Sequence, residues 1–102
     1  MSLTMLGEKD PKVLRALYIF RNEVFQDGEL SEREKELIAL AITSVQKCEK
    51  CFEYHADAAL KAGATPRQLL EVQEVVMYMT GPSGMIWSEK IDEYARKEIT
   101  PP

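Results

Sequence analysis

The stretch SEREKELIALAI, residues 31–42, predicts a helix at the centre of the fold. Ser31 and Glu34 have the spacing of a capping box, in which two side chains bond the free backbone N–H groups of a helix start. The leucines and alanines that follow are strong helix formers. Because the segment LIALAI, residues 37–42, is apolar in nearly every direction around its axis, we expect neighbouring helices to cover it on several sides.

Four more helices are predicted from caps and breakers on either side of this stretch. Asp10 followed by Pro11 is typical of a helix start. Thr65, Pro66 and Gln68 repeat the signal as a second capping box with proline at the first helical position. The approximate ranges of the four helices are 11–27, 48–62, 66–80 and 83–96. Because no stretch alternates with a period of two for long enough to form a strand, the predicted class is all-α.

The length and composition of the chain narrow the choice of architecture. Since the 102 residues contain no internal repeat and no linker, we expect residues 1–102 to form one domain, a compact bundle of about five to six helices. Apolar residues make up 45% and charged residues 29%, which is typical of a folded globular protein and not of a disordered one.

Charge and hydropathy argue against two classes of partner. Lys and Arg total 13 against 17 for Asp and Glu, and no basic run is long enough to follow a phosphate backbone, so no nucleic acid is expected. The longest apolar run, residues 37–42, is far shorter than the roughly 20 residues that cross a bilayer, so no membrane partner is expected. The first ten residues lack the pattern of an export signal. We therefore expect a cytoplasmic, reducing setting, where a close cysteine pair is more often catalytic or metal-binding than structural.

The stretch KCEKCFEYH, residues 47–55, contains both cysteines and the only histidine of the chain. On a helix over residues 48–62, Cys48, Cys51 and His55 lie at i, i+3 and i+7 along one face, so they can share a pocket. A helix start or a nearby histidine lowers the pKa of a thiol below its usual value of about 8.5 and so favours the thiolate. His55, one turn beyond Cys51, can accept the thiol proton or stabilise the thiolate.

Three other interpretations of this stretch stay open on the residues alone. The cysteines can be small buried apolar side chains, with His55 packed in the core beside them. A zinc site would need a carboxylate or another subunit, because structural zinc takes four ligands and the chain offers two Cys and one His. A structural disulfide is disfavoured by the reducing setting and by the small loop it would close. We expect neither a metal nor a cofactor.

A glutamate upstream of the cysteines completes a longer pattern. Glu36 precedes Cys48 with eleven residues between them, in the stretch ELIALAITSVQKCEKCFEYH. This spacing of Glu, Cys, Cys and His resembles the signature of the alkylhydroperoxidase D-like group within the carboxymuconolactone decarboxylase superfamily. The neighbouring segments LSEREKELIALA, HADAALKAGAT and MTGPSG are also similar, and the resemblance covers about residues 30–90. A CxxC alone is a weak signal, whereas the added glutamate and histidine make the combination fairly specific.

The resemblance implies an all-helical, alkylhydroperoxidase D-like fold and a thiol-dependent peroxidase. It makes Cys51 the nucleophile that attacks a peroxide oxygen, and Cys48 the thiol that resolves the resulting sulfenic acid as a disulfide. His55 would take the Cys51 proton, and Glu36 would orient His55 or relay the proton. A resolving thiol one turn away suits this chemistry, because an isolated sulfenic acid can over-oxidise. The implied partners are a hydroperoxide substrate and an external dithiol reductant.

Two departures from the family pattern leave other functions open. The residue before the second cysteine is a histidine in the best-known peroxidase of the group but Lys50 here, and a lysine does not readily accept a proton near neutral pH. The chain also holds one copy of the motif, whereas longer members carry two helical halves. The alternatives are a lactone decarboxylase of the same superfamily and a non-enzymatic thiol redox sensor or assembly module. No arginine or second histidine near the motif supports the decarboxylase.

Apolar surface on the later helices predicts self-association. The run VVMYM, residues 75–79, points in every direction around a helix, so one core cannot cover all of it. The run MIW, residues 85–87, is likewise too apolar in successive positions for one core to cover. We therefore expect a homo-oligomer. The resemblance implies a hexamer built as a trimer of dimers, with the cysteine pocket close to a subunit boundary.

Overall fold

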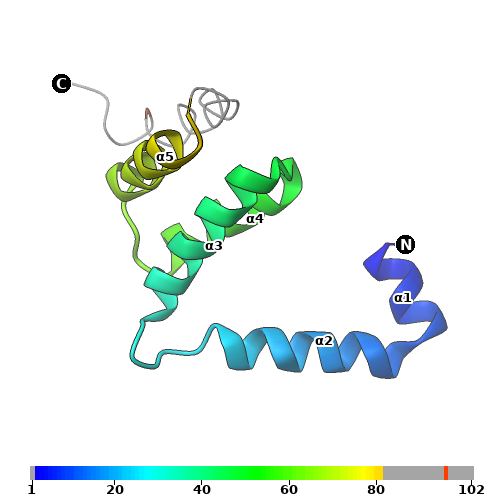
Figure 1. The fold of residues 1–102 in the computed structure, drawn as a ribbon. Coiled ribbons are helices and arrows are strands. Elements are labelled where there is room, and N and C mark those ends of the chain that lie inside the picture. The colour runs from blue at the N-terminus through cyan, green and yellow to red at the C-terminus, as the bar shows by residue number, and fades with distance from the viewer. Residues whose placement is uncertain (1, 82–95, 97–102) are drawn as a thin grey trace. The chain divides into compact units, whose positions relative to one another are not determined.

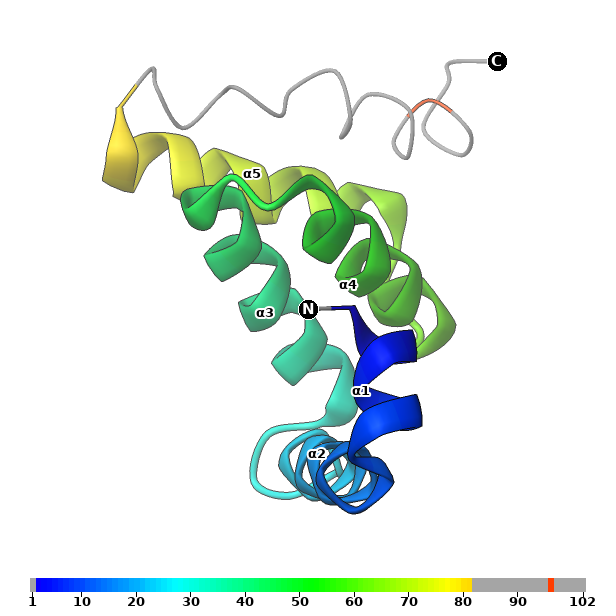
Figure 2. The same cartoon turned by 90° about the vertical axis from the view of Figure 1, so that its right-hand side faces the viewer.

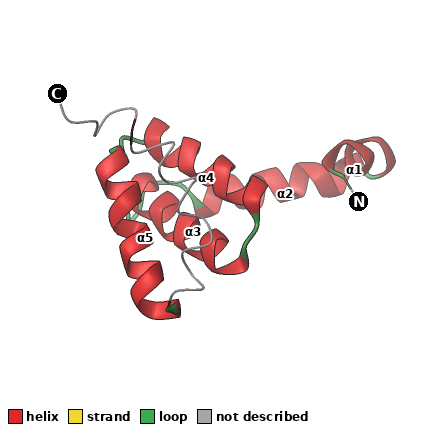
Figure 3. Ribbon diagram, turned by 90° about the horizontal axis from the view of Figure 1, so that it is seen from above, coloured by secondary structure: helices red, strands yellow, loops and turns green. Residues whose placement is uncertain are grey.

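The structure, a computed structural model, describes residues 2–81 and residue 96. This part of the chain contains five α-helices and no strand (Figure 3). The helices are α1 (Leu3–Lys9), α2 (Pro11–Val24), α3 (Glu32–Gln46), α4 (Glu49–Lys61) and α5 (Pro66–Thr80). The all-α prediction is confirmed. The helix predicted over residues 83–96 lies outside the described residues except for Arg96.

The chain divides into two units (Figure 1). Residues 1–31 carry α1 and α2, and residues 32–102 carry α3, α4 and α5. The expected single domain over residues 1–102 stays a prediction. No helix in the described part of the chain is both long enough and apolar enough to span a membrane.

The N-terminal unit contains a helix that was not predicted. The Ser2 hydroxyl accepts a hydrogen bond from the Met5 N–H at 3.1 Å and caps α1. The sequence signal for this helix is weak, because α1 has only seven residues and includes Gly7. A Cβ on Gly7 would lie 2.9 Å from Leu14 Cδ2, so the glycine permits the close approach of α1 and α2. Neither helix contains a buried residue.

In the C-terminal unit α3 is the central helix, because it packs against both α4 and α5 (Figure 2). The core combines large residues from each of these helices with small ones: Leu40, Phe52, Ala56, Ala59, Ala64 and Leu69. The expectation that α3 is covered on several sides holds only in part, since Ile38, Ile42 and Val45 are about half exposed. A buried hydrogen bond of 2.8 Å from Gln73 Nε2 to Ser44 Oγ adds a polar link between α5 and α3.

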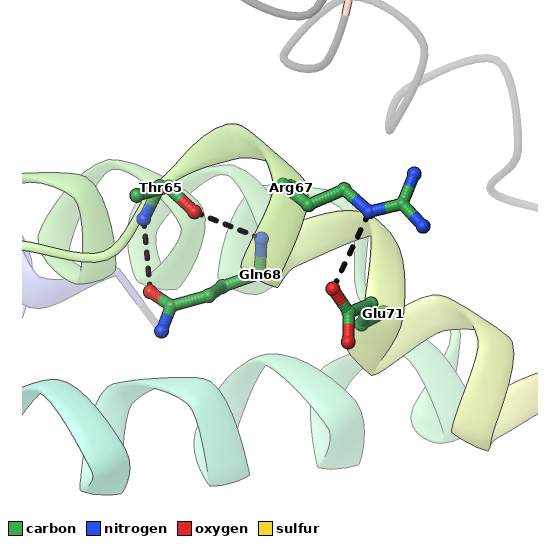
Figure 4. A network of polar contacts seen from close by, with 4 residues as sticks. All are labelled: Thr65, Arg67, Gln68 and Glu71. Carbon is green, nitrogen blue, oxygen red and sulfur yellow. Dashed lines mark hydrogen bonds and ion pairs between the residues drawn. The ribbon is translucent and has the colours of Figure 1, made fainter.

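The capping box predicted for α5 is confirmed (Figure 4). The Gln68 N–H donates to Thr65 Oγ1 at 3.1 Å, and the Thr65 N–H donates to Gln68 Oε1 at 3.0 Å. Pro66 occupies the first helical position, where a missing N–H costs nothing. On the exposed side of the same turn, Arg67 Nε bonds Glu71 Oε2 at 3.3 Å. Two pairs of side chains thus stabilise the start of this helix.

The junction between α3 and α4 is a tight turn at Lys47. This residue has φ of +59°, the left-handed region that favours glycine. The Lys47 N–H donates to the Ser44 carbonyl and the Cys48 N–H to the Thr43 carbonyl, both at 3.2 Å, which is the bonding pattern of a Schellman motif. The Cys48 carbonyl in turn accepts from the Phe52 N–H at 2.9 Å. The backbone of Cys48 is therefore fixed by bonds to both helices.

We expect the Lys47→Gly substitution to raise the free energy of unfolding by about 0.5–1 kcal/mol. In the folded state, glycine avoids the cost of roughly 1–2 kcal/mol that a side chain incurs in the left-handed conformation. In the unfolded state, glycine has more conformational entropy, which offsets about 0.4–1 kcal/mol of this gain. Gly63 offers a matched comparison after α4, because it has φ of +104° and its N–H and that of Ala64 make the same pair of bonds. No atom lies within 4 Å of a Cβ built on Gly63, so Gly63→Ala should destabilise through backbone strain alone. Urea unfolding of both variants in one redox state measures the two effects, and a less stable Lys47→Gly protein would contradict the strain at Lys47.

Candidate functional site

The two cysteines lie at the start of α4 and are joined by a disulfide. Cys48 is the N-cap residue, Cys51 is the third helical residue, and their Cα atoms are 5.3 Å apart. Side chains at these two positions lie close together, as at the start of α5, where Thr65 and Gln68 each bond the backbone N–H of the other. A CxxC that begins a helix therefore places its two sulfur atoms near each other.

The environment of the pair leaves it accessible. Cys51 is exposed and Cys48 is half-buried, whereas Phe52, the next residue, is fully buried in the core. The idea that both cysteines are simply buried apolar side chains is therefore wrong for Cys51. Since the disulfide encloses only two intervening residues, it restricts the unfolded chain little and contributes little to stability. Such a pair is better suited to redox chemistry than to a structural role.

A carboxylate and an imidazole meet beside this helix start. Glu36 Oε2 of α3 lies 2.6 Å from His55 Nδ1 of α4. Glu36 is only 1% exposed and His55 is 18% exposed, so the bond is shielded from water. A buried carboxylate requires polar partners, and the imidazole is one of them. When Glu36 is ionised it can only accept, so Nδ1 is the donor and Nε2 is the ring atom that can take up a proton.

The structure places the four predicted residues in two bonded pairs. Cys48 is bonded to Cys51, and Glu36 is bonded to His55. His55 follows Cys51 by four residues on α4, one turn further along the same face. Their catalytic roles stay predictions. Lys50, the residue before Cys51, is exposed at the second position of α4.

A fifth residue of this face was missed in the sequence analysis. The ring of Tyr54 lies edge-on to the ring of His55, with centroids 5.1 Å apart and an angle of 86° between the planes. The signal was present in the sequence, because position 54 is three residues after Cys51 and therefore on the same side of the helix.

Within the described residues, no group of three or more His, Cys, Asp or Glu side chains is arranged to hold a metal ion.

Comparison with known proteins gives a consistent family match. A family model described as "Carboxymuconolactone decarboxylase family" matches residues 11–88. An uncharacterized protein of Cupriavidus necator is 34% identical over 89 residues, which are 87% of this chain and 79% of that protein. A Paracoccus denitrificans protein, "Uncharacterized protein 4 in cox locus", is 46% identical over 48 residues, which are 47% of this chain and 43% of its own length.

A solved structure is similar over most of the chain. It is the crystal structure of the apo form of a carboxymuconolactone decarboxylase family protein from Legionella pneumophila. The match has a TM-score of 0.82 and 25% sequence identity, and it covers 93% of this chain and 85% of the Legionella chain. The fold and the sequence therefore point to the same group of proteins.

Proposed function

The chain belongs to the carboxymuconolactone decarboxylase family, and within that family we propose that it is a thiol-dependent peroxidase. The observation that carries the proposal is the partly buried bond between Glu36 and His55, with His55 one helical turn along α4 from the exposed Cys51. A base whose second nitrogen is held by a carboxylate is the usual means of activating a nucleophile. The proposed setting is the cytoplasm, where dithiol reductants keep thiols reduced.

The first step is the oxidation of Cys51. Its thiolate attacks one oxygen of a hydroperoxide, so that a sulfur–oxygen bond forms and the oxygen–oxygen bond breaks. The products are the Cys51 sulfenic acid and the alcohol of the substrate, or water when the substrate is hydrogen peroxide. His55 takes the thiol proton and returns it to the departing oxygen. Glu36 holds the imidazole so that Nε2 serves this purpose, which supports a short proton relay without Lys50.

The second step restores a resting state. The Cys48 thiol attacks the sulfenic sulfur, which forms the Cys48–Cys51 disulfide and releases water. An external dithiol then reduces this disulfide and becomes a disulfide itself. The sum is one hydroperoxide and one dithiol converted into one alcohol, one water and one oxidised dithiol. The structure corresponds to the oxidised form of the pair.

Repeated turnover is the test of this function. The purified protein should consume many equivalents of an organic hydroperoxide when dithiothreitol is supplied, and none after its thiols have been blocked by alkylation. Consumption of one equivalent per chain, with no further turnover, would favour the redox sensor. Activity on a carboxylated lactone that survives alkylation would favour the decarboxylase. Either result would contradict the peroxidase.

The proposal includes self-association of the chain. Most of the run at residues 75–79 is exposed on α5, as a group of apolar side chains comprising Val75, Met77, Tyr78 and Met79. An apolar groove of about 370 Å³ between α3 and α5 continues this surface. Such a surface supports burial against another subunit. We expect light scattering on a size-exclusion peak to give about six times 11.6 kDa for the hexamer, while a mass near 11.6 kDa at micromolar concentration would contradict any oligomer.

A further inference from the structure

We propose that Tyr54 is a specificity-determining residue that favours hydroperoxides carrying a flat apolar group, such as an aryl group, over hydrogen peroxide. This inference rests on the peroxidase function proposed above and names the class of substrate for the same site. It assigns a role to an aromatic side chain that the proton relay does not use.

The position of Tyr54 on α4 places it beside the attacking sulfur. Tyr54 and His55 follow Cys51 by three and four residues on one helix. Residues at these spacings are neighbours on a helix surface. Because helical side chains lean toward the N-terminus of their helix, we expect both rings to lean toward the turn that carries Cys51. A substrate that reaches this sulfur would then come close to the Tyr54 ring.

Exposure distinguishes Tyr54 from the other aromatic residue of this turn. Phe52 is fully buried in the core, whereas Tyr54 keeps 51% of its surface exposed. The perpendicular contact with His55, at 5.1 Å between centroids, gives the Tyr54 ring a neighbour on one side. A partly exposed ring three residues along the helix from the exposed Cys51 offers a surface on which an apolar substituent loses contact with water. Hydrogen peroxide has no apolar substituent, so the Tyr54 ring does not stabilise its binding.

The size of the effect follows from the energetics of aromatic pairs. The binding free energy of one aromatic pair is enough to raise kcat/KM by about threefold to tenfold for a substrate whose ring packs on Tyr54, relative to a substrate without a ring. The hydroxyl of Tyr54 has no part in this contact. Removing the ring should therefore abolish the preference, while removing only the hydroxyl should keep it.

The first measurement compares kcat/KM for cumene hydroperoxide and for hydrogen peroxide. Tyr54→Ala should lower the ratio of the two values by about threefold to tenfold with hydrogen peroxide nearly unaffected, and Tyr54→Phe should keep the wild-type ratio. An equal loss for both peroxides in Tyr54→Ala would mean that the ring only supports His55, and would overturn the proposal.

A second measurement needs no peroxide chemistry. In reduced Cys48→Ser protein, Cys51 is the only thiol, and its rates of reaction with benzyl and methyl methanethiosulfonate can be compared. The benzyl-to-methyl ratio should be about threefold to tenfold higher with Tyr54 than with Tyr54→Ala. Equal ratios would overturn the inference. If Cys48→Ser protein shows this preference while wild-type protein turns over no peroxide, the proposed function is refuted, and the packing of a flat apolar group on Tyr54 beside Cys51 still stands.

Discussion

Cys51→Ser is expected to reduce dithiol-dependent consumption of hydroperoxide to the rate of a protein-free mixture. The reacting species is a thiolate, and a serine hydroxyl at the same position does not ionise near neutral pH. Cys51 is also the more exposed residue of the pair and lies one turn from His55, whereas Cys48 lies two turns away. Steady-state consumption of cumene hydroperoxide with dithiothreitol measures the loss directly.

Cys48→Ser is the matched control, because both variants lack the disulfide and differ only in which sulfur is left. It should still reduce one equivalent of hydroperoxide rapidly and accumulate the Cys51 sulfenic acid, which dimedone traps and mass spectrometry detects. With excess peroxide it should over-oxidise to the sulfinic acid, since the resolving thiol is absent. If Cys51→Ser were the variant that kept the rapid first oxidation, the two roles would be reversed.

Helices α4 and α5 of the C-terminal unit could be predicted because short-range sequence signals mark their ends. The threonine cap of α5 and the glycine after α4 fix backbone geometry locally, and the predicted limits differ from those of the structure by about one residue. The turn at Lys47 could not be predicted in this way. A lysine gives no sign of a left-handed conformation, which is held here by the bonds of Lys47 and Cys48 to the end of α3.

Residue spacing predicted the part of the site that lies on α4, but not the contact between Glu36 and His55. Cys48, Cys51 and His55 lie on one helix, so their common face follows from the period of 3.6 residues. The contact between Glu36 and His55 joins residues 19 positions apart on two helices, and it depends on how α3 packs on α4. Nothing in the local sequence separates Glu36 from the other acidic residues of α3, so it was found only through the family resemblance. Tyr54 was not singled out, although its spacing of three residues from Cys51 places it on the same side of the helix.

His55→Ala is expected to slow the first oxidation of reduced protein by about 10²-fold or more, if the imidazole is the general base. Glu36→Gln should have a milder effect of about tenfold, because the amide can still contact Nδ1 but no longer selects its protonated form. Stopped-flow measurement of a single turnover isolates this step from reduction of the disulfide. A His55→Ala protein with the full single-turnover rate would show that the histidine only packs.

Stability must be separated from catalysis in this comparison, because Glu36 is 1% exposed and loses its imidazole partner in His55→Ala. Weakening a buried polar pair costs about 1–3 kcal/mol, so the variant should unfold at lower urea concentration even though it still folds. His55→Gln provides the control, since its amide can keep a hydrogen bond to the carboxylate but cannot act as a base. If the histidine acts chemically, His55→Gln should recover stability and remain about 10²-fold slow, and added imidazole should partly restore the rate of His55→Ala. Recovery of the rate together with the stability in His55→Gln would instead assign the Glu36–His55 pair a purely structural role.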